Sequence, residues 1–285
     1  MVKYVEKIEG AINGFGLSER QINDLKGMNV TLELSPSAYQ ELGEKVPKND
    51  APVVGIILDN KDGYYFVPWS LVKVMAKVGT RINFITHENC EQQMKNINGL
   101  ILPDGNFNLP EEYYSDAKPD HNQEDQECEA YYQCFDSAFD NESIAILALG
   151  KGALFMQGYI GFALFRSASR DYFETPFNHA DCEHDIEIKK GTKFWTLMKR
   201  QDVLKKVKSH HNQFLAPPRV QKEILGGGDA MTVYASSRDG MPEAFGGMDG
   251  GMLGILWDCA DMAAQGDENQ LAIFKWLVKQ MKLRY

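Results

Sequence analysis

The sequence predicts an α/β fold in which a mostly parallel sheet is flanked by helices. Continuous apolar runs such as Val53 to Leu58 are typical of strands that are buried on both faces. Helical patterns separate the short apolar strands, and this alternation indicates parallel strands joined by helical crossovers. The run Ile144–Leu149 gives a third indication, because it leads through Gly150-Lys151-Gly152 directly into a helical pattern.

The expected elements follow from the length and periodicity of the apolar runs. In the first half we expect strands at Val53–Leu58, Ile82–Ile85, Leu100–Leu102 and Ile144–Leu149, and helices at Trp69–Val78 and Glu124–Phe139. In the second half the alternating pattern predicts antiparallel strands near the edge of the sheet, at Asp185–Ile188 and Met231–Ala235. The apolar run Leu271–Val278 predicts a closing helix.

Residues 1–50 precede this alternating pattern and carry a helix signal of their own. Ser18 is expected to cap a helix, and Gln21 three residues later completes a capping box. The proline-rich sequence that ends at Pro52 is typical of a connection between parts of a chain. We therefore expect residues 1–50 to be an N-terminal helical extension and residues 51–285 to be one larger domain.

Composition excludes some classes of partner. The 285 residues carry a formal net charge of −10, which argues against nucleic acid or an anionic membrane surface as a partner. The five cysteines have no metal-finger or redox-motif spacing, so we expect reduced thiols in a cytoplasmic protein. No apolar run approaches the roughly 20 residues of a membrane span. The charged N-terminus, with Lys3 and Glu6, is unlike a signal peptide.

The turn after Ile144–Leu149 has the layout of a nucleophile elbow. In such an elbow a sharp strand-to-helix turn holds a reactive side chain above a parallel sheet. The residue at the apex of this turn is Gly150, which has no side chain. The sequence therefore predicts the frame of a hydrolytic site without its nucleophile, and this leaves open whether the protein is an enzyme.

Four segments, in order along the chain, resemble the motifs of one superfamily. They are Pro52–Asp59 with Tyr65–Val72, Asn98–Phe107, the turn at 146–152, and Val207–Gln213 with Gly254–Ala260. A further match is Asp239-Gly240-Met241-Pro242-Glu243-Ala244, which has the form Asp-Gly-x-x-Glu-Ala of the same superfamily. Together they resemble class I glutamine amidotransferases, and most closely the γ-glutamyl-γ-aminobutyrate hydrolase group. The resemblance implies a three-layer, flavodoxin-like amidotransferase domain over residues 51–285.

The resemblance also implies that the chemistry of this group is lost. Its active members use a Cys at the elbow, whose thiolate attacks a γ-glutamyl amide, and a His oriented by a Glu two residues later. The matching positions here are Gly150, Asp258 and Ala260, so all three catalytic residues are replaced. Asp104 stands where the oxyanion loop has its first glycine, and an anionic side chain there would oppose oxyanion stabilisation.

A binding function through the former active-site pocket is therefore the main hypothesis. The ligand would be a small γ-glutamyl-like or anionic molecule, or a partner protein, and a homodimer is the default assembly. The residues that the resemblance places in the pocket are Asp104, Gly105, Lys151, Gly152, His211 and Gln213. We expect no cofactor and no metal, because His179, Asp181 and His184 follow no established ligand spacing.

Two alternatives remain open. The first is an active hydrolase with displaced catalytic residues, in which Cys259 or Asp258 acts together with His211. Cys182 and His184 are a weaker pair of this kind and are more typical of a structural strand. The second alternative is an interaction module whose contacts are made by residues 1–50 and by the polar stretch 104–126.

Overall fold

The computed structural model describes residues 1–284 with the exception of 9–12, 116–125, 167–178, 219 and 221–231. The chain divides into two compact units. Unit 1 comprises Met1–Phe107, Asp125–Ile146 and Ala260–Tyr285, and unit 2 comprises Asn108–Glu124 and Leu147–Cys259. Each unit is described by itself below.

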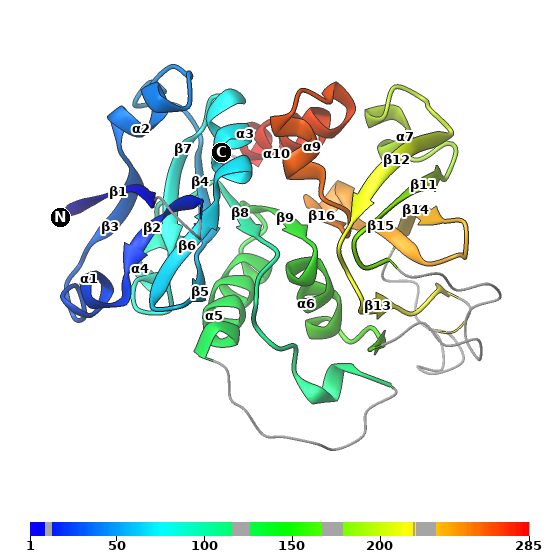
Figure 1. The fold of residues 1–285 in the computed structure, drawn as a ribbon, viewed down its shortest axis with the longest axis horizontal. Helices are drawn as coiled ribbons and strands as arrows, with labels where there is room; N and C mark the ends of the chain where they lie inside the picture. Colours follow the sequence, from blue (N-terminus) through cyan, green and yellow to red (C-terminus); the bar gives the residue numbers. More distant parts are fainter. Residues whose placement is uncertain (9–12, 116–125, 167–178, 219, 221–231, 285) are drawn as a thin grey trace. The chain divides into compact units, whose positions relative to one another are not determined.

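Unit 1 is built on a mixed sheet with parallel strands at its centre. Strand β4 (Val53–Ile57) lies between β7 (Arg81–Ile85) and β8 (Gly99–Leu102) and is parallel to both. The side chains of Val54, Ile56 and Ile57 are fully buried, as expected of a strand covered on both faces. Helices α3 (Trp69–Lys77), α5 (Gln126–Asp140) and α10 (Glu268–Arg284) lie around these strands (Figure 1). The predicted α/β fold class is therefore confirmed.

The remaining elements of unit 1 are short. The sheet continues from β7 through β3, β1, β2 and β6 to β5. These strands are β1 (Val2–Ile8), β2 (Gly14–Ser18), β3 (Thr31–Leu34), β5 (Asp59–Lys61) and β6 (Tyr64–Pro68). The short helices are α1 (Glu19–Asn23), α2 (Pro36–Glu41), α4 (Cys90–Met94) and α9 (Cys259–Ala264), of which α9 begins at the last residue of unit 2.

Residues 1–50 differ from the helical extension that the sequence predicts. The capping box is present, because Gln21 N donates to Ser18 Oγ at 3.3 Å and Ser18 N donates to Gln21 Oε1 at 2.8 Å. However, three strands lie beside the two short helices, and β3 pairs with β7 through Leu32 and Phe84. Residues 1–50 therefore contain strands as well as the expected helix, and these strands extend the sheet of unit 1.

Physical reasons explain why these strands escape sequence analysis. Their sequences, VKYVEKI, GFGLS and TLEL, mix polar residues and glycine with apolar ones, so no continuous apolar run marks them. Strand β2 also contains Gly16, a residue that is depleted in strands. A Cβ at Gly16 would lie 2.0 Å from Tyr65 O on β6, so the close approach of the two backbones requires glycine.

Unit 2 contains an antiparallel sheet with the strand order β12, β11, β14, β15 and β16. This confirms the antiparallel strands predicted for the second half of the chain. The bounds of these strands are β11 (Cys182–Ile188), β12 (Val203–Ser209), β14 (Thr232–Ser237), β15 (Pro242–Gly247) and β16 (Met252–Ile255). A two-stranded sheet pairs β10 (Leu164–Phe165) with β13 (Phe214–Leu215).

Helix α6 (Lys151–Tyr159) is the longest described helix of unit 2 and packs against β16. The short elements are α7 (Lys193–Leu197) and the 3₁₀ turns η1 (Glu111–Tyr113) and η2 (Met248–Gly250). Strand β9 (Ala145–Leu149) begins in unit 1 and leads along the chain into α6. Among the described residues, no helix has the length and apolar character needed to span a bilayer.

Candidate functional site

The strand-to-helix bend that the sequence predicts is present at Gly150. This residue connects β9 to α6 and has a φ of 51° and a ψ of −123°. Such a positive φ is strained for residues with a Cβ, so glycine relieves the turn of strain. Gly150 N donates to Ile255 O at 2.8 Å, which ties the bend to β16. At its apex the bend presents only backbone atoms and no nucleophile.

The next two residues begin α6. Lys151 is half-buried and Gly152 is buried. The first N–H groups of a helix have no acceptor within the helix, and the helix dipole places partial positive charge there. The Lys151 ammonium adds a full positive charge at this end. The start of α6 therefore has the electrostatic character expected of an anion-binding segment.

Asp258 stands where the family resemblance expects a catalytic histidine. Its backbone N donates to Lys208 O at 2.8 Å, which holds the residue beside the end of β12. Its Oδ2 lies 2.8 Å from His210 Nε2, and His210 Nδ1 lies 3.5 Å from Asp181 Oδ1. Asp258 thus forms an ion pair with His210, whereas the alternative of an active hydrolase expects His211 as its partner.

The other two residues of this segment carry little chemistry. The Cys259 side chain is buried, with 1% of the residue exposed. Ala260, in α9, has only a methyl group where the resemblance expects a glutamate. Because a thiolate nucleophile needs an accessible and activated sulfur, the burial of Cys259 disfavours its proposed catalytic role.

Asp104 and Gly105 belong to unit 1, in the loop after β8. Asp104 is exposed, whereas Gly105 packs against the buried Asp59, whose Oδ1 would lie 3.2 Å from an added Cβ. Asn106 N donates to both carboxylate oxygens of Asp59 at 3.2 Å. The Asp59 carboxylate therefore sets the shape of this loop, a role that the sequence did not reveal.

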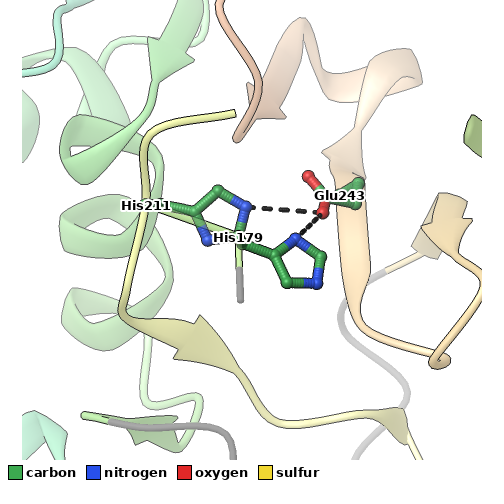
Figure 2. A group of neighbouring side chains, drawn as sticks. All are labelled: His179, His211 and Glu243. Atoms are coloured by element: carbon green, nitrogen blue, oxygen red, sulfur yellow. Dashed lines mark ion pairs between the residues drawn. The ribbon is translucent and has the colours of Figure 1, made fainter. Parts of the chain in front are cut away.

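A buried group of three imidazoles and two carboxylates lies in unit 2. We call it the histidine cluster, and its members are His179, His184, His211, Asp239 and Glu243. Figure 2 shows His179 and His211 pointing toward the carboxylate of Glu243 on β15. Glu243 Oε1 lies 3.0 Å from His179 Nδ1, 3.4 Å from His211 Nε2 and 3.5 Å from His184 Nε2. Three rings therefore converge on one oxygen atom.

The rings of His179 and His211 are also held from their other sides. His179 Nε2 lies 3.0 Å from Asp239 Oδ2, and Asp239 in turn accepts a short hydrogen bond from Ser237 Oγ. His211 Nδ1 lies 3.1 Å from the main-chain oxygen of Gln213. The Phe214 ring meets His179 and His211 edge-on, at centroid distances of 5.6 and 5.4 Å. These contacts fix the orientation of the rings.

Burial and charge act in opposite directions on the titration of the histidine cluster. Burial lowers the pKa of His179, but the adjacent carboxylates of Asp239 and Glu243 outweigh it and raise this pKa to about 9. Burial raises the pKa of Glu243, but the charge of His211 and the bond to His179 lower it to about 2. Burial also dominates at His184, where it lowers the pKa. Glu243 is therefore a carboxylate at neutral pH.

Cys182 lies on β11 beside this cluster and is partly exposed. Burial and the nearby carboxylates of Glu243, Asp181 and Asp239 all raise the pKa of its thiol. A raised pKa keeps the sulfur protonated at neutral pH, and the thiol is a poor nucleophile. These properties favour a structural role for Cys182 and His184 on β11 over a catalytic one, as the sequence does.

The structure brings together only some of the residues that the sequence predicts. His211 and Gln213 are in contact, but through the main chain of Gln213 and not through its amide. Asp181 lies near His210 and not with His179 and His184. Sequence reasoning missed Asp239 and Glu243 as site residues, although the motif Asp-Gly-x-x-Glu-Ala contained both. Among the described residues, the potential-ligand atoms of His179, His211 and Glu243 all lie within 4.8 Å of one another.

Comparison with known proteins gives a family and a fold. A family model described as Peptidase C26 matches residues 52–258 of the chain. No curated protein matches the chain. This family is class I glutamine amidotransferase-like, in agreement with the motifs between Pro52 and Ala260.

The chain is also similar to several solved structures. A putative GMP synthase component from Thermoplasma acidophilum has a TM-score of 0.57 and 11% identity, over 83% of this chain and 96% of that one. A glutamine amidotransferase from Thermotoga maritima has a TM-score of 0.54 and 11% identity, over 82% and 99%. The glutaminase domain of CTPS from Trypanosoma brucei has a TM-score of 0.52 and 10% identity, over 80% and 94%. At such identities these likenesses show the shared fold.

Proposed function

Because the chain belongs to the peptidase C26 family, we propose that it is a catalytically inactive member that binds a small γ-glutamyl-like or anionic ligand. The observation that carries this proposal is the bare backbone at Gly150. Acyl transfer in this family requires a side chain at the bend that can form a covalent bond with the γ-glutamyl carbon. Glycine has no such atom, and its φ of 51° keeps it at the apex of the turn.

The replaced proton-transfer residues support the same proposal. A carboxylate at Asp258, paired with the His210 imidazole at 2.8 Å, is not the histidine that would shuttle a proton to the leaving group. Ala260 cannot orient a histidine, because it has no hydrogen-bonding side chain. Loss of even one triad member lowers kcat by about 10⁴ to 10⁶. Loss of all three leaves no family mechanism.

Binding is proposed at the start of α6. Backbone N–H groups at a helix N-terminus and the Lys151 ammonium together favour a carboxylate or another anion. A γ-glutamyl-like molecule carries such a carboxylate. A partner protein that offers an acidic side chain would use the same chemistry.

Turnover assays test the catalytic part of the proposal. Purified protein is incubated with glutamine and with γ-glutamyl amides, and ammonia and amine release are measured against a blank without protein. The expected result is no release above the blank. Release above the blank, abolished by a single substitution in this chain, would show that an active site is present.

Binding measurements test the ligand part. Isothermal titration with glutamate and with a γ-glutamyl dipeptide is expected to give a signal that weakens by about tenfold in Lys151→Ala, because one charge-assisted contact is lost. Lys190→Ala is the matched control, since Lys190 is exposed and pairs with Asp202 at 2.8 Å. Equal affinity in all three proteins would refute a role for Lys151.

The alternative of an active hydrolase with displaced residues has less support. Cys259 is buried, and His211 Nδ1 is engaged by the Gln213 main chain. Iodoacetamide at neutral pH separates the two cases, since an activated thiol is alkylated rapidly and a buried thiol is not. Rapid, stoichiometric alkylation of Cys259 would favour the alternative.

A further inference from the structure

Glu243, His179 and His211 have an arrangement that the proposed binding function does not explain. They come from three separate parts of unit 2: β15, the segment before β11, and the segment after β12. All three residues are buried, and Glu243 and His179 are 0% exposed. A fully buried carboxylate requires a compensating positive charge. The nature of that charge decides the chemistry of the histidine cluster.

Hydrogen-bonding logic assigns the protons of the two rings. The main-chain oxygen of Gln213 only accepts, so the His211 Nδ1 beside it, at 3.1 Å, carries a proton. The Asp239 carboxylate likewise accepts the proton of His179 Nε2 at 3.0 Å. Without a metal ion, a further proton on His179 Nδ1 can balance the charge of Glu243. A metal ion replaces that proton and leaves both rings neutral, with the lone pairs of His211 Nε2 and His179 Nδ1 pointing at the inner region where Glu243 Oε1 lies. Three acceptor atoms facing one another repel unless a cation lies among them.

Polar atoms at the contact between His211 and Glu243 also lack hydrogen-bond partners. Among the described residues, His211 Nε2 and both carboxylate oxygens of Glu243 have no hydrogen-bond partner. The contact from His211 Nε2 to Glu243 Oε1 is 3.4 Å, an ion-pair distance without hydrogen-bond alignment. Unsatisfied buried polar groups of this kind are rare, and the binding of an ion is one established reason for them.

The distances fit a metal ion. Zn²⁺ binds imidazole nitrogen and carboxylate oxygen at about 2.0–2.1 Å, so neighbouring ligand atoms of a tetrahedral site are about 3.3 Å apart. The observed distances from Glu243 Oε1 are 3.0 Å to His179 Nδ1 and 3.4 Å to His211 Nε2. The three ligand atoms all lie within 4.8 Å of one another.

The contacts behind the ligands match those of metal-bound histidines. Such histidines donate their second N–H to a carboxylate or a backbone carbonyl, which fixes the ring orientation. Asp239 does this for His179, and the Gln213 carbonyl does it for His211. His184 is held differently, because its Nε2 lies 2.8 Å from Ser209 Oγ. Because Ser209 engages this nitrogen of His184, a water molecule would supply the fourth ligand of the ion.

We propose that His179, His211 and Glu243 form a binding site for a divalent transition-metal ion, with Zn²⁺ as the preferred occupant. Two imidazoles and one carboxylate suit Zn²⁺, whereas Mg²⁺ and Ca²⁺ prefer sites made of oxygen ligands. The ion links three segments of unit 2 and stabilises its fold. This site is independent of the proposed function at Gly150 and stands or fails separately from it.

The first test uses the full-length wild-type protein without a polyhistidine tag. The protein is stripped with chelator, incubated with Zn²⁺ alone, desalted and analysed by inductively coupled plasma mass spectrometry. The expected result is one Zn²⁺ per chain, and incubation with Co²⁺ is expected to give the intense visible absorption of a four-coordinate site. A chain that retains no Zn²⁺ and shows no such absorption would overturn the proposal and would leave protons as the charge partners of Glu243.

Variants then locate the ion. Glu243→Gln and His211→Gln are expected to lose the bound Zn²⁺, whereas His210→Gln, a change of the same type at the neighbouring residue, retains it. Undiminished binding in both cluster variants would place the ion elsewhere and overturn the proposal. Far-UV circular dichroism checks that the variants fold. If they do not, thermal unfolding of the wild type decides: a hundredfold excess of Zn²⁺ over its Kd should raise Tm by about 5–10 °C, and an unchanged Tm would contradict the site.

Discussion

The backbone conformation at Gly150 can be tested by adding a single methyl group. We predict that Gly150→Ala destabilises the protein. A φ of 51° with a ψ of −123° lies in a region where a Cβ is strained. Residues that are held in such regions lose about 1–3 kcal/mol. The hydrogen bond from Gly150 N to Ile255 O at 2.8 Å keeps the backbone from relaxing freely. Urea denaturation should therefore show a loss of about 1–3 kcal/mol in the free energy of unfolding.

Two other glycines serve as controls for this prediction. Gly240 has a φ of 83° and open space around it, so Gly240→Ala should lose about 1–2 kcal/mol from backbone strain alone. Gly250 also has open space but no positive φ, and Gly250→Ala should be neutral or stabilising by up to about 1 kcal/mol. If Gly150→Ala behaves like Gly250→Ala, the backbone at Gly150 does not have a positive φ, and the bend is not that of a nucleophile elbow.

Three further predictions concern unit 1. Deletion of residues 1–50 should abolish cooperative thermal unfolding, because it removes β1, β2 and β3 from the sheet, and an intact transition would show that these strands are dispensable. Asp59→Ala should destabilise the protein by about 1–3 kcal/mol in urea denaturation, because the Asn106 N–H loses its acceptor; Asp59→Asn should lose less, and equal losses would refute this role. The Sγ atoms of Cys90 and Cys134 are 2.6 Å apart, so oxidised glutathione should convert them to a disulfide detectable by mass spectrometry. The reaction should be slow at neutral pH and faster as pH rises, since burial raises the pKa of the Cys134 thiol; a pair that stays reduced at high pH would contradict this.

Parts of the fold were predictable because continuous apolar runs leave little ambiguity. Strands β4 and β9 are buried along almost their whole length, and their apolar sequences show this directly. The hairpin of β5 and β6 was not predicted, although Asp62-Gly63 between them is a strong turn signal. Both turn residues have a positive φ, at 52° and 79°. The apolar pattern does not mark this hairpin, because β5 has only three residues and all three are polar.

The candidate site was predictable only where its residues are neighbours along the chain. The bend at Gly150 could be predicted because strand, turn and helix are contiguous. The histidine cluster could not, because His179 and Glu243 are 64 positions apart and meet only through the pairing of antiparallel strands. Spacing rules for metal ligands describe ligands that share one turn or one helix. They therefore carry no information on ligands that separate strands contribute.

The central proposal is that the bend at Gly150 offers no side-chain atom that can form a covalent intermediate with a γ-glutamyl group. Its most direct test is intact-protein mass spectrometry after incubation with a chromogenic γ-glutamyl ester and an acid quench. The account predicts an unmodified mass, and the same mass in Gly150→Ala apart from the added methyl group. A stoichiometric γ-glutamyl adduct that is suppressed by excess glutamine would contradict the account, whichever residue carries it.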